Sequence, residues 1–295
     1  MITILLFGAG GQLGQELLAR APTPDIAIVG RTRSEVDIAN EAEVHAALTR
    51  IRPDIVVNAG GYTKVDKAEA EPDAAFKANA MGPAVLARAC KRAGIALVHL
   101  STDYVFDGKK MGAYVETDPI GPLGVYGRSK AEGEAAVRAE LDRHIILRTS
   151  WLYGAYGANF LKTILRLAGE RDEIRVVADQ YGCPTGTVDL AEAVLRVAPM
   201  LGAGSGVWGT YNFAGLGRTT WYGFASVIAD ELSQLSGRRV NIVPIASAEY
   251  ASAARRPENS ELDSSRFANI FGFSAIPWEK RARELVRLLW RSNSR

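Results

Sequence analysis

The stretch Ile2-Thr3-Ile4-Leu5-Leu6-Phe7, followed at once by Gly8-Ala9-Gly10-Gly11-Gln12-Leu13-Gly14, decides the fold of this chain. This run of six residues, apolar except for Thr3, has the length of a buried strand, and a helical pattern begins after the glycines. Glycines spaced as Gly8-x-x-Gly11-x-x-Gly14 let the backbone approach a pyrophosphate, and the amino terminus of the following helix offers free N–H groups and a positive dipole. The order of strand, glycine turn and helix therefore predicts a dinucleotide site rather than only a tight turn.

Four further apolar runs of strand length begin near residues 26, 55, 97 and 144, with helical patterns between them. This alternation is typical of a parallel sheet covered by helices on both faces. We expect an α/β chain with a Rossmann-type, doubly wound parallel sheet over residues 1–150, completed by parts of 176–217. Residues 151–295 should form a smaller, interleaved α/β substrate-binding lobe, with a glycine-rich link at 202–206.

The residues after the second strand bear on the choice of cofactor. Ile26–Val29 leads into Gly30-Arg31-Thr32-Arg33. A site for NAD places an acidic residue about 20 positions beyond the glycines, on the ribose 2′-hydroxyl, whereas an arginine suits a 2′-phosphate. Arg31 therefore favours NADPH, with NADH still possible, although both arginines could be solvated loop residues.

Small residues also follow the third strand, Ile55–Asn58, which ends at Ala59-Gly60-Gly61-Tyr62-Thr63. At the carboxyl end of a strand, small residues allow a cofactor to lie against the backbone. A tight turn is the alternative interpretation. We expect Ala59 and Gly60 to contact the same cofactor as Gly8 and Gly11.

A candidate catalytic group lies between Leu97 and Lys130. Leu97–Leu100 reads as a buried strand that places Thr102 at its carboxyl end, and Tyr126 and Lys130 are four residues apart in a helical pattern. An ammonium beside a phenol favours the phenolate and lowers the phenol pKa from about 10 towards the working pH, which makes Tyr126 a usable proton donor. Thr102 could supply a hydroxyl to the same substrate oxygen. The Tyr/Lys pair alone is a weak signal, because surface helices carry such pairs routinely.

Composition excludes several classes of function. Of 295 residues, 47% are hydrophobic and 23% charged, as in an ordinary globular protein, and a net charge of +2 gives no electrostatic case for nucleic acid or a membrane surface. The two cysteines, Cys90 and Cys183, match no disulfide or metal-ligand spacing. The sequence shows no signal peptide and no apolar run of about 18 residues, so we expect a cytoplasmic protein.

Taken together, these motifs resemble the extended short-chain dehydrogenase/reductase family, and more narrowly its reductases of dTDP-4-dehydro-L-rhamnose. The narrower resemblance rests on sequence blocks that span nearly the whole chain. These blocks are Gly8-x-x-Gly11-x-x-Gly14, Tyr62-Thr63-Lys64-Val65-Asp66-Lys67-Ala68-Glu69, Ser101-Thr102-Asp103-Tyr104-Val105-Phe106-Asp107-Gly108, Tyr126-x-x-x-Lys130, Arg148-Thr149-Ser150-Trp151, Asp179-Gln180-x-Gly182-x-Pro184-Thr185, Thr220-Trp221-Tyr222 and Arg255-Arg256-Pro257-x-Asn259-Ser260.

The resemblance implies a reaction and a set of site residues. NADPH would deliver hydride to the C4 carbonyl of dTDP-4-dehydro-L-rhamnose, and Tyr126 would protonate the emerging alkoxide, giving dTDP-L-rhamnose for cell-surface polysaccharide. The implied catalytic residues are Thr102, Tyr126 and Lys130. The cofactor-binding residues are Gly8, Gly11, Gln12, Leu13, Arg31, Asp37, Ile38, Ala59, Gly60, Gly61, Tyr62, Thr63, Tyr126 and Lys130. The substrate-binding residues are Thr102, Asp103, Trp151, Trp221 and Arg255.

The resemblance also has a departure and leaves alternatives. Some family members dimerise through magnesium held by carboxylates; Glu16 matches one ligand, but Asp189 stands where a glutamate is expected and Leu288 near another. We therefore expect a monomer or homodimer with no metal needed for chemistry. One alternative is a nucleotide-sugar epimerase or dehydratase that retains NAD. The other is a non-catalytic NADP-binding regulatory subunit.

Overall fold

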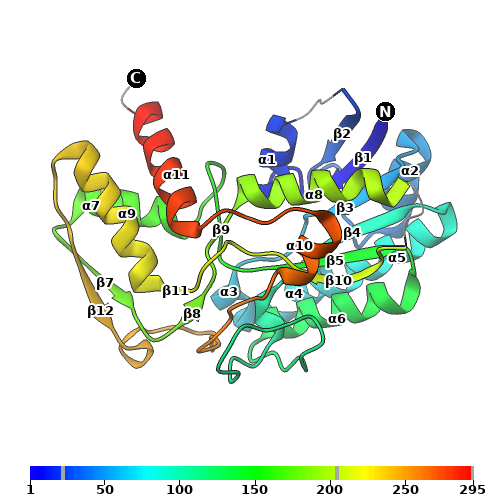
Figure 1. Cartoon of the computed structure of the whole chain (residues 1–295). Helices are drawn as coiled ribbons and strands as arrows, with labels where there is room; N and C mark the ends of the chain where they lie inside the picture. The colour runs from blue at the N-terminus through cyan, green and yellow to red at the C-terminus, as the bar shows by residue number, and fades with distance from the viewer. Residues whose placement is uncertain (21–23, 203–205, 294–295) are drawn as a thin grey trace.

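A parallel six-stranded sheet forms the centre of the molecule (Figure 1). The computed structural model describes residues 1–20, 24–202 and 206–293, so most of the predicted link at 202–206 lies outside the described residues. The strand order is β10-β5-β4-β3-β1-β2, and every neighbouring pair is parallel. The strands are β1 (Ile2–Phe7), β2 (Ile26–Arg31), β3 (Ile55–Asn58), β4 (Ala96–Thr102), β5 (His144–Thr149) and β10 (Gly209–Asn212). The predicted parallel α/β sheet is confirmed.

Helices cover both faces of this sheet, because its strands are apolar on both sides. On β1, Ile4 and Leu6 face one hydrophobic core and Leu5 and Phe7 face another, as the alternation of side chains along a strand requires. The first core includes α1 (Gln12–Arg20), α8 (Thr187–Gly202) and α10 (Ser265–Phe271). The second includes α2 (Glu41–Ile51), α5 (Gly82–Ala93) and α6 (Val125–Glu140).

A second group of elements lies beside the sheet, at the left of Figure 1. It contains the helices α7 (Phe160–Glu170), α9 (Trp221–Ser236) and α11 (Trp278–Asn293), and a parallel pair of strands, β7 (Glu173–Val177) and β12 (Asn241–Ile245). Two short pairs connect it to the sheet, namely β6 (Leu152–Tyr153) with β9 (Thr185–Gly186) and β8 (Tyr181–Gly182) with β11 (Thr219–Thr220). Aromatic side chains fill its core, among them Tyr153, Phe224 and Trp278.

Between β3 and α5 the chain forms three short helical segments. They are α3 (Val65–Ala70), α4 (Pro72–Phe76) and a π-helical turn, η1 (Lys77–Met81). Proline is favoured in a first helical turn, where its missing N–H is not needed, so Pro72 starts a new helix. The π turn buries the amide of Asn79, which accepts from the backbone N–H of Tyr62 at 2.8 Å and donates to its carbonyl at 3.0 Å.

Both cysteines, Cys90 and Cys183, are buried and free, in agreement with the spacing argument. Among the helices that the structure describes, none combines the length and apolarity needed to span a membrane.

Candidate functional site

The carboxyl ends of β1, β2, β3 and β4 open onto a cavity of about 820 Å³. This volume lies within the usual range of small-molecule sites, and the carboxyl edge of a parallel sheet is where such folds bind ligands. Residues of the first half of the chain supply most of the wall, and Trp151, Phe160 and Trp221 close it from the second half.

The glycine turn after β1 forms one end of this cavity. Gly8 has φ +86°, and a Cβ added there would lie 2.4 Å from the amide nitrogen of Gly60, so two strand ends meet backbone to backbone. Gly11 donates its N–H to the carbonyl of Gly8 at 3.0 Å, and α1 begins at Gln12 with no acidic residue in its first turn. Bare backbone at a positive helix end fits a pyrophosphate.

Of the two arginines that follow β2, the one that lines the cavity is not the one favoured from the sequence. Arg33 lines the cavity, whereas Arg31 does not and donates to the carbonyl of Gly30 at 2.7 Å. Glu35 accepts from the N–H and hydroxyl of Thr32, both at 2.7 Å, and these hydrogen bonds lower its pKa. The cation that this loop presents to the cavity is therefore Arg33.

Asp37 and Ile38, two of the cofactor-binding residues implied by the resemblance, also line the cavity. The Asp37 carboxylate pairs with Lys77 at 2.9 Å, and this hydrogen bond is the main cause that lowers its pKa. Lys77 lines the cavity as well and was not singled out from the sequence, because nothing in its spacing distinguishes it from a surface lysine.

Thr102, Tyr126 and Lys130 line one wall of the same cavity. Thr102 ends β4 and donates to Asp103 Oδ1 at 3.0 Å, while the Tyr126 phenol shares a hydrogen bond with the Thr102 hydroxyl. Tyr126 lies in the first turn of α6, and Lys130 follows one turn later. The Lys130 ammonium donates to the carbonyl of Leu100 at 2.5 Å.

The expected lowering of the Tyr126 pKa is wrong for this structure. Burial raises the pKa of Tyr126 to about 12, the Asp103 carboxylate adds to the rise, and the Thr102 hydrogen bond opposes it. The Lys130 ammonium is committed to the Leu100 carbonyl, and burial lowers its own pKa to about 8. Desolvation is the largest influence on the Tyr126 pKa, so Tyr126 carries its proton at neutral pH.

Asp103 lies beneath this group and is only 2% exposed. Its carboxylate accepts from Thr102 and, at 3.0 Å, from the hydroxyl of Ser150, and it also hydrogen-bonds with Ser260. Burial raises its pKa to about 6, against the effect of these hydrogen bonds. Asp103 therefore joins the ends of β4 and β5 to the loop before α10.

Trp151 and Trp221 form a flat aromatic wall of the cavity. Their rings stack with centroids 3.5 Å apart and an angle of 8° between their planes. Trp151 has φ +43°, a left-handed backbone that is rare for a bulky residue and is found mostly where function requires it. Gly182 makes room for this indole, since a Cβ there would lie 2.5 Å from the ring.

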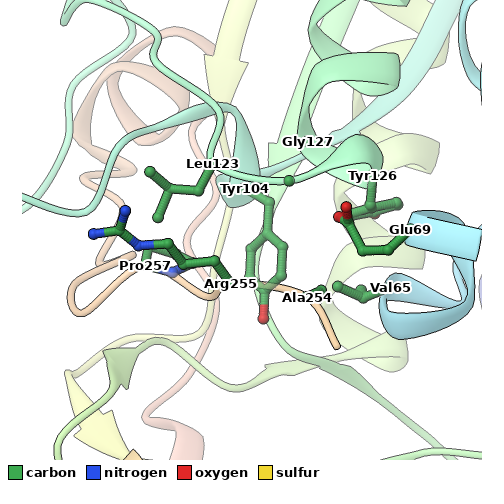
Figure 2. A pocket seen from close by; sticks show the side chains of 10 residues that line it. Val65, Glu69, Tyr104, Leu123, Tyr126, Gly127, Ala254, Arg255 and Pro257 are labelled. Atoms are coloured by element: carbon green, nitrogen blue, oxygen red, sulfur yellow. The ribbon is translucent and has the colours of Figure 1, made fainter. Parts of the chain in front are cut away.

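Arg255 is the predicted substrate residue that the structure does not bring into the main cavity. It lines a separate small cavity of about 10 Å³, together with Glu69, Tyr104 and Tyr126. Figure 2 shows its guanidinium pointing away from Tyr126. The neighbouring Arg256 forms an ion pair with Asp66 at 2.7 Å.

Asn159 is a lining residue that the sequence analysis missed. Its amide donates to Gln12 Oε1 at 3.1 Å, which ties the start of α7 to the glycine turn, and its carbonyl oxygen caps α7 by accepting from the N–H of Lys162. An asparagine before a helical pattern signals a cap, but no local signal places it beside a turn 147 residues earlier.

The two carboxylates that the sequence analysis considered for a metal-linked dimer are held within the chain. Glu16 accepts from Thr187 at 2.9 Å, and Asp189 accepts from Arg281 at 2.7 and 2.8 Å. Within residues 1–20, 24–202 and 206–293, no group of three or more His, Cys, Asp or Glu side chains could hold a metal ion.

Comparison with known proteins gives a consistent result over nearly the whole chain. The family model of the RmlD substrate binding domain matches residues 2–290. The dTDP-4-dehydrorhamnose reductase of Sinorhizobium fredii is 43% identical over 95% of each chain, and that of Escherichia coli K12 is 38% identical over 98% of each. A crystal structure of dTDP-4-dehydrorhamnose reductase from Bacillus anthracis in complex with NADP is 36% identical, covers 96% of this chain and 98% of that one, and superposes with a TM-score of 0.89.

Proposed function

This chain belongs to the family of the RmlD substrate binding domain, and from that premise we infer that it is an NADPH-dependent reductase of the C4 keto group of dTDP-4-dehydro-L-rhamnose, forming dTDP-L-rhamnose. The observation that carries this function is the placement of Thr102, Tyr126 and Lys130 on one wall of the cavity that also holds the glycine turn. A proton donor and a nucleotide cradle in one cavity suit a carbonyl reduction.

When bound, NADPH supplies the hydride. Its pyrophosphate would lie at the turn of Gly8 and Gly11, where a Cβ would fill the space between two backbones. Arg33 is the cation placed for the 2′-phosphate, since Arg31 is engaged with the backbone. The rest of this wall is formed by Gln12, Leu13, Asp37, Ile38, Ala59, Gly60, Gly61, Tyr62 and Thr63.

Tyr126 gives its proton to the oxygen at C4 of the sugar. Its raised pKa keeps the phenol protonated at neutral pH, and its hydrogen bond with Thr102 directs the hydroxyl to the place where charge develops. Lys130, with a pKa of about 8, lies one helical turn away and favours the tyrosinate once the proton has left.

Asp103, Trp151 and Trp221 form the part of the cavity that receives the dTDP-sugar. The stacked indoles offer a flat apolar surface to a nucleotide sugar, and Asp103 offers a hydrogen-bond acceptor. Arg255 would contribute to diphosphate binding only after its side chain turns towards the main cavity. We assign residues 1–150, with parts of 176–217, to the cofactor domain and 151–295 to the substrate lobe, in a monomer or homodimer.

The test is an assay of sugar-dependent NADPH oxidation, monitored by the absorbance of NADPH. The substrate dTDP-4-dehydro-L-rhamnose is generated in situ. Tyr126→Phe should lower kcat at least about 100-fold, within the range typical of lost proton transfer. Tyr250→Phe, at an exposed tyrosine outside the cavity, should leave the rate unchanged. NADPH binding without sugar-dependent turnover in the unmodified chain would contradict the function.

A further inference from the structure

The helix α3 contains the block Val65-Asp66-Lys67-Ala68-Glu69, to which the proposed reaction assigns no role. Asp66 and Glu69 are three residues apart and so project from one side of this short helix. Each carboxylate reaches a different part of the chain beside the catalytic wall.

Glu69 reaches the start of α6, the helix that carries Tyr126 and Lys130. Its Oε1 accepts from the backbone N–H of Val125 at 2.7 Å. The N-cap residue of α6 is Gly124, which has no side chain to satisfy this first turn, and the turn contains no acidic residue of its own. Glu69 therefore caps the helix from a distant segment, next to the residue that precedes Tyr126 (Figure 2).

Gly124 and Glu69 fit each other closely. A Cβ on Gly124 would lie 2.6 Å from Glu69 Oε1, so any side chain at 124 would push the carboxylate away from Val125. The backbone of Gly124, with φ −121° and ψ 175°, is extended and open to alanine without strain. The contact with Glu69, rather than backbone conformation, is thus what an alanine at this position would disturb.

Asp66 supports the other side of Tyr126. It accepts from the guanidinium of Arg256 at 2.7 and 3.2 Å and from the N–H of Ala254 at 3.2 Å. Arg256 hydrogen-bonds in turn with the phenol of Tyr104. The Tyr104 ring packs edge-on against Tyr126, with centroids 5.8 Å apart and planes at 77°.

We propose that Glu69 is a positioning residue for Tyr126: by capping the first turn of α6 it holds the phenol in place for proton transfer, while Asp66 on the same helix supports the opposite side. This role rests on the proposed reductase function. Placement of a catalytic group matters steeply, because an error of about 1 Å can cost about 100-fold in rate.

The experiment compares Glu69→Ala, which removes the acceptor, with Glu69→Gln, which keeps an oxygen for the Val125 N–H. The matched control is Glu170→Ala, at an exposed glutamate paired with Arg166 on α7. Glu69→Ala should lower kcat about tenfold and change KM for NADPH less than about twofold, while Glu69→Gln and the control retain at least about half of kcat. An equal loss in Glu69→Gln, or no loss of kcat in Glu69→Ala, would overturn the proposal.

A double-variant cycle tests the same contact from the other partner. Gly124→Ala should lower kcat about tenfold in the native chain but no more than about twofold when Glu69 is already alanine, since the carboxylate it displaces is gone. If the losses of kcat multiply in the double variant, the two substitutions act independently, and the capping argument is refuted.

Hydrogen exchange of the peptide that begins at Val125 gives a readout without catalysis. Exchange should accelerate in Glu69→Ala and Gly124→Ala, and stay at the native rate in Glu69→Gln and Glu170→Ala. If the native chain reduces no sugar, the proposed function fails. The exchange rates then test, without catalysis, whether Glu69 caps α6. Equal exchange in all variants would exclude it.

Discussion

Replacing Lys130 by methionine should stabilise the folded chain at pH 7, although it removes a residue of the proposed catalytic group. Lys130 is 6% exposed, and burial lowers its pKa from 10.5 to about 8. That difference corresponds to about 3 kcal/mol by which the buried ammonium weakens folding at neutral pH. Methionine has a similar volume and carries no charge, but it loses the hydrogen bond to Leu100, worth about 1 kcal/mol. The expected net gain is about 2 kcal/mol.

The gain should disappear as the pH rises. The pKa of Lys130 is lower in the folded than in the unfolded chain, so between pH 8 and 10.5 the unfolded chain binds the additional proton and the native protein gains stability. Below pH 8 both states are protonated and the full penalty remains. At pH 10 the penalty is below about 1 kcal/mol, and the methionine variant should match the native chain.

Urea denaturation of both proteins without nucleotide, at pH 7 and at pH 10, measures this difference. Effects of pH on other groups cancel when the two proteins are compared at each pH. A variant that is less stable than the native chain at pH 7, or a difference in unfolding free energy that is the same at both pH values, would refute the argument that the ammonium is buried at a cost.

Three further outcomes follow from the cavity and its surroundings. Gly8→Ala should weaken NADP⁺ binding in calorimetry at least about tenfold, because the added methyl meets backbone 2.4 Å away at a left-handed φ; unchanged affinity would contradict the cradle. Arg33→Ala should raise KM for NADPH about tenfold and leave KM for NADH within about twofold. Arg31→Ala is the control, and an equal rise of KM for NADPH in both variants would contradict the assignment of Arg33. Glu134→Leu should lower the free energy of unfolding by about 3–5 kcal/mol in urea denaturation, because it leaves the buried Arg148 unpaired. Adding Arg148→Met should recover part of this loss, and no recovery in the double variant would contradict the argument from the ion pair.

Local signals predicted the strands and the glycine turn because their causes are local. β3 spans the predicted residues 55–58, directly before the small residues that the sequence analysis singled out. Thr102, Tyr126 and the two indoles line one cavity, since strand ends and helical spacing determine which edge of a sheet a residue reaches.

Contacts between distant segments escaped prediction. The spacing of Tyr126 and Lys130 puts them on one face of α6, but it does not show that the ammonium reaches the Leu100 carbonyl instead of the phenol. Likewise, Asp66 meets Arg256 across 190 residues, and Glu69 meets Val125 across 56. Such pairs depend on how whole elements pack, and side-chain direction at that scale has no signature in a single stretch of sequence.

The position of β10 has a consequence for synthesis of the chain on the ribosome. β10 pairs with β5 at the edge of the sheet, and α8 covers the face that β1 presents through Ile4 and Leu6. A nascent chain that has emerged only to residue 150 has α1 on this face but lacks α8 and α10, and the edge of β5 is unpaired; exposed apolar surface and an open strand edge both favour aggregation. The sheet gains its last strand only when β10 emerges, and its first core is complete only after α10, so the two halves of the chain complete their folding together rather than one after the other.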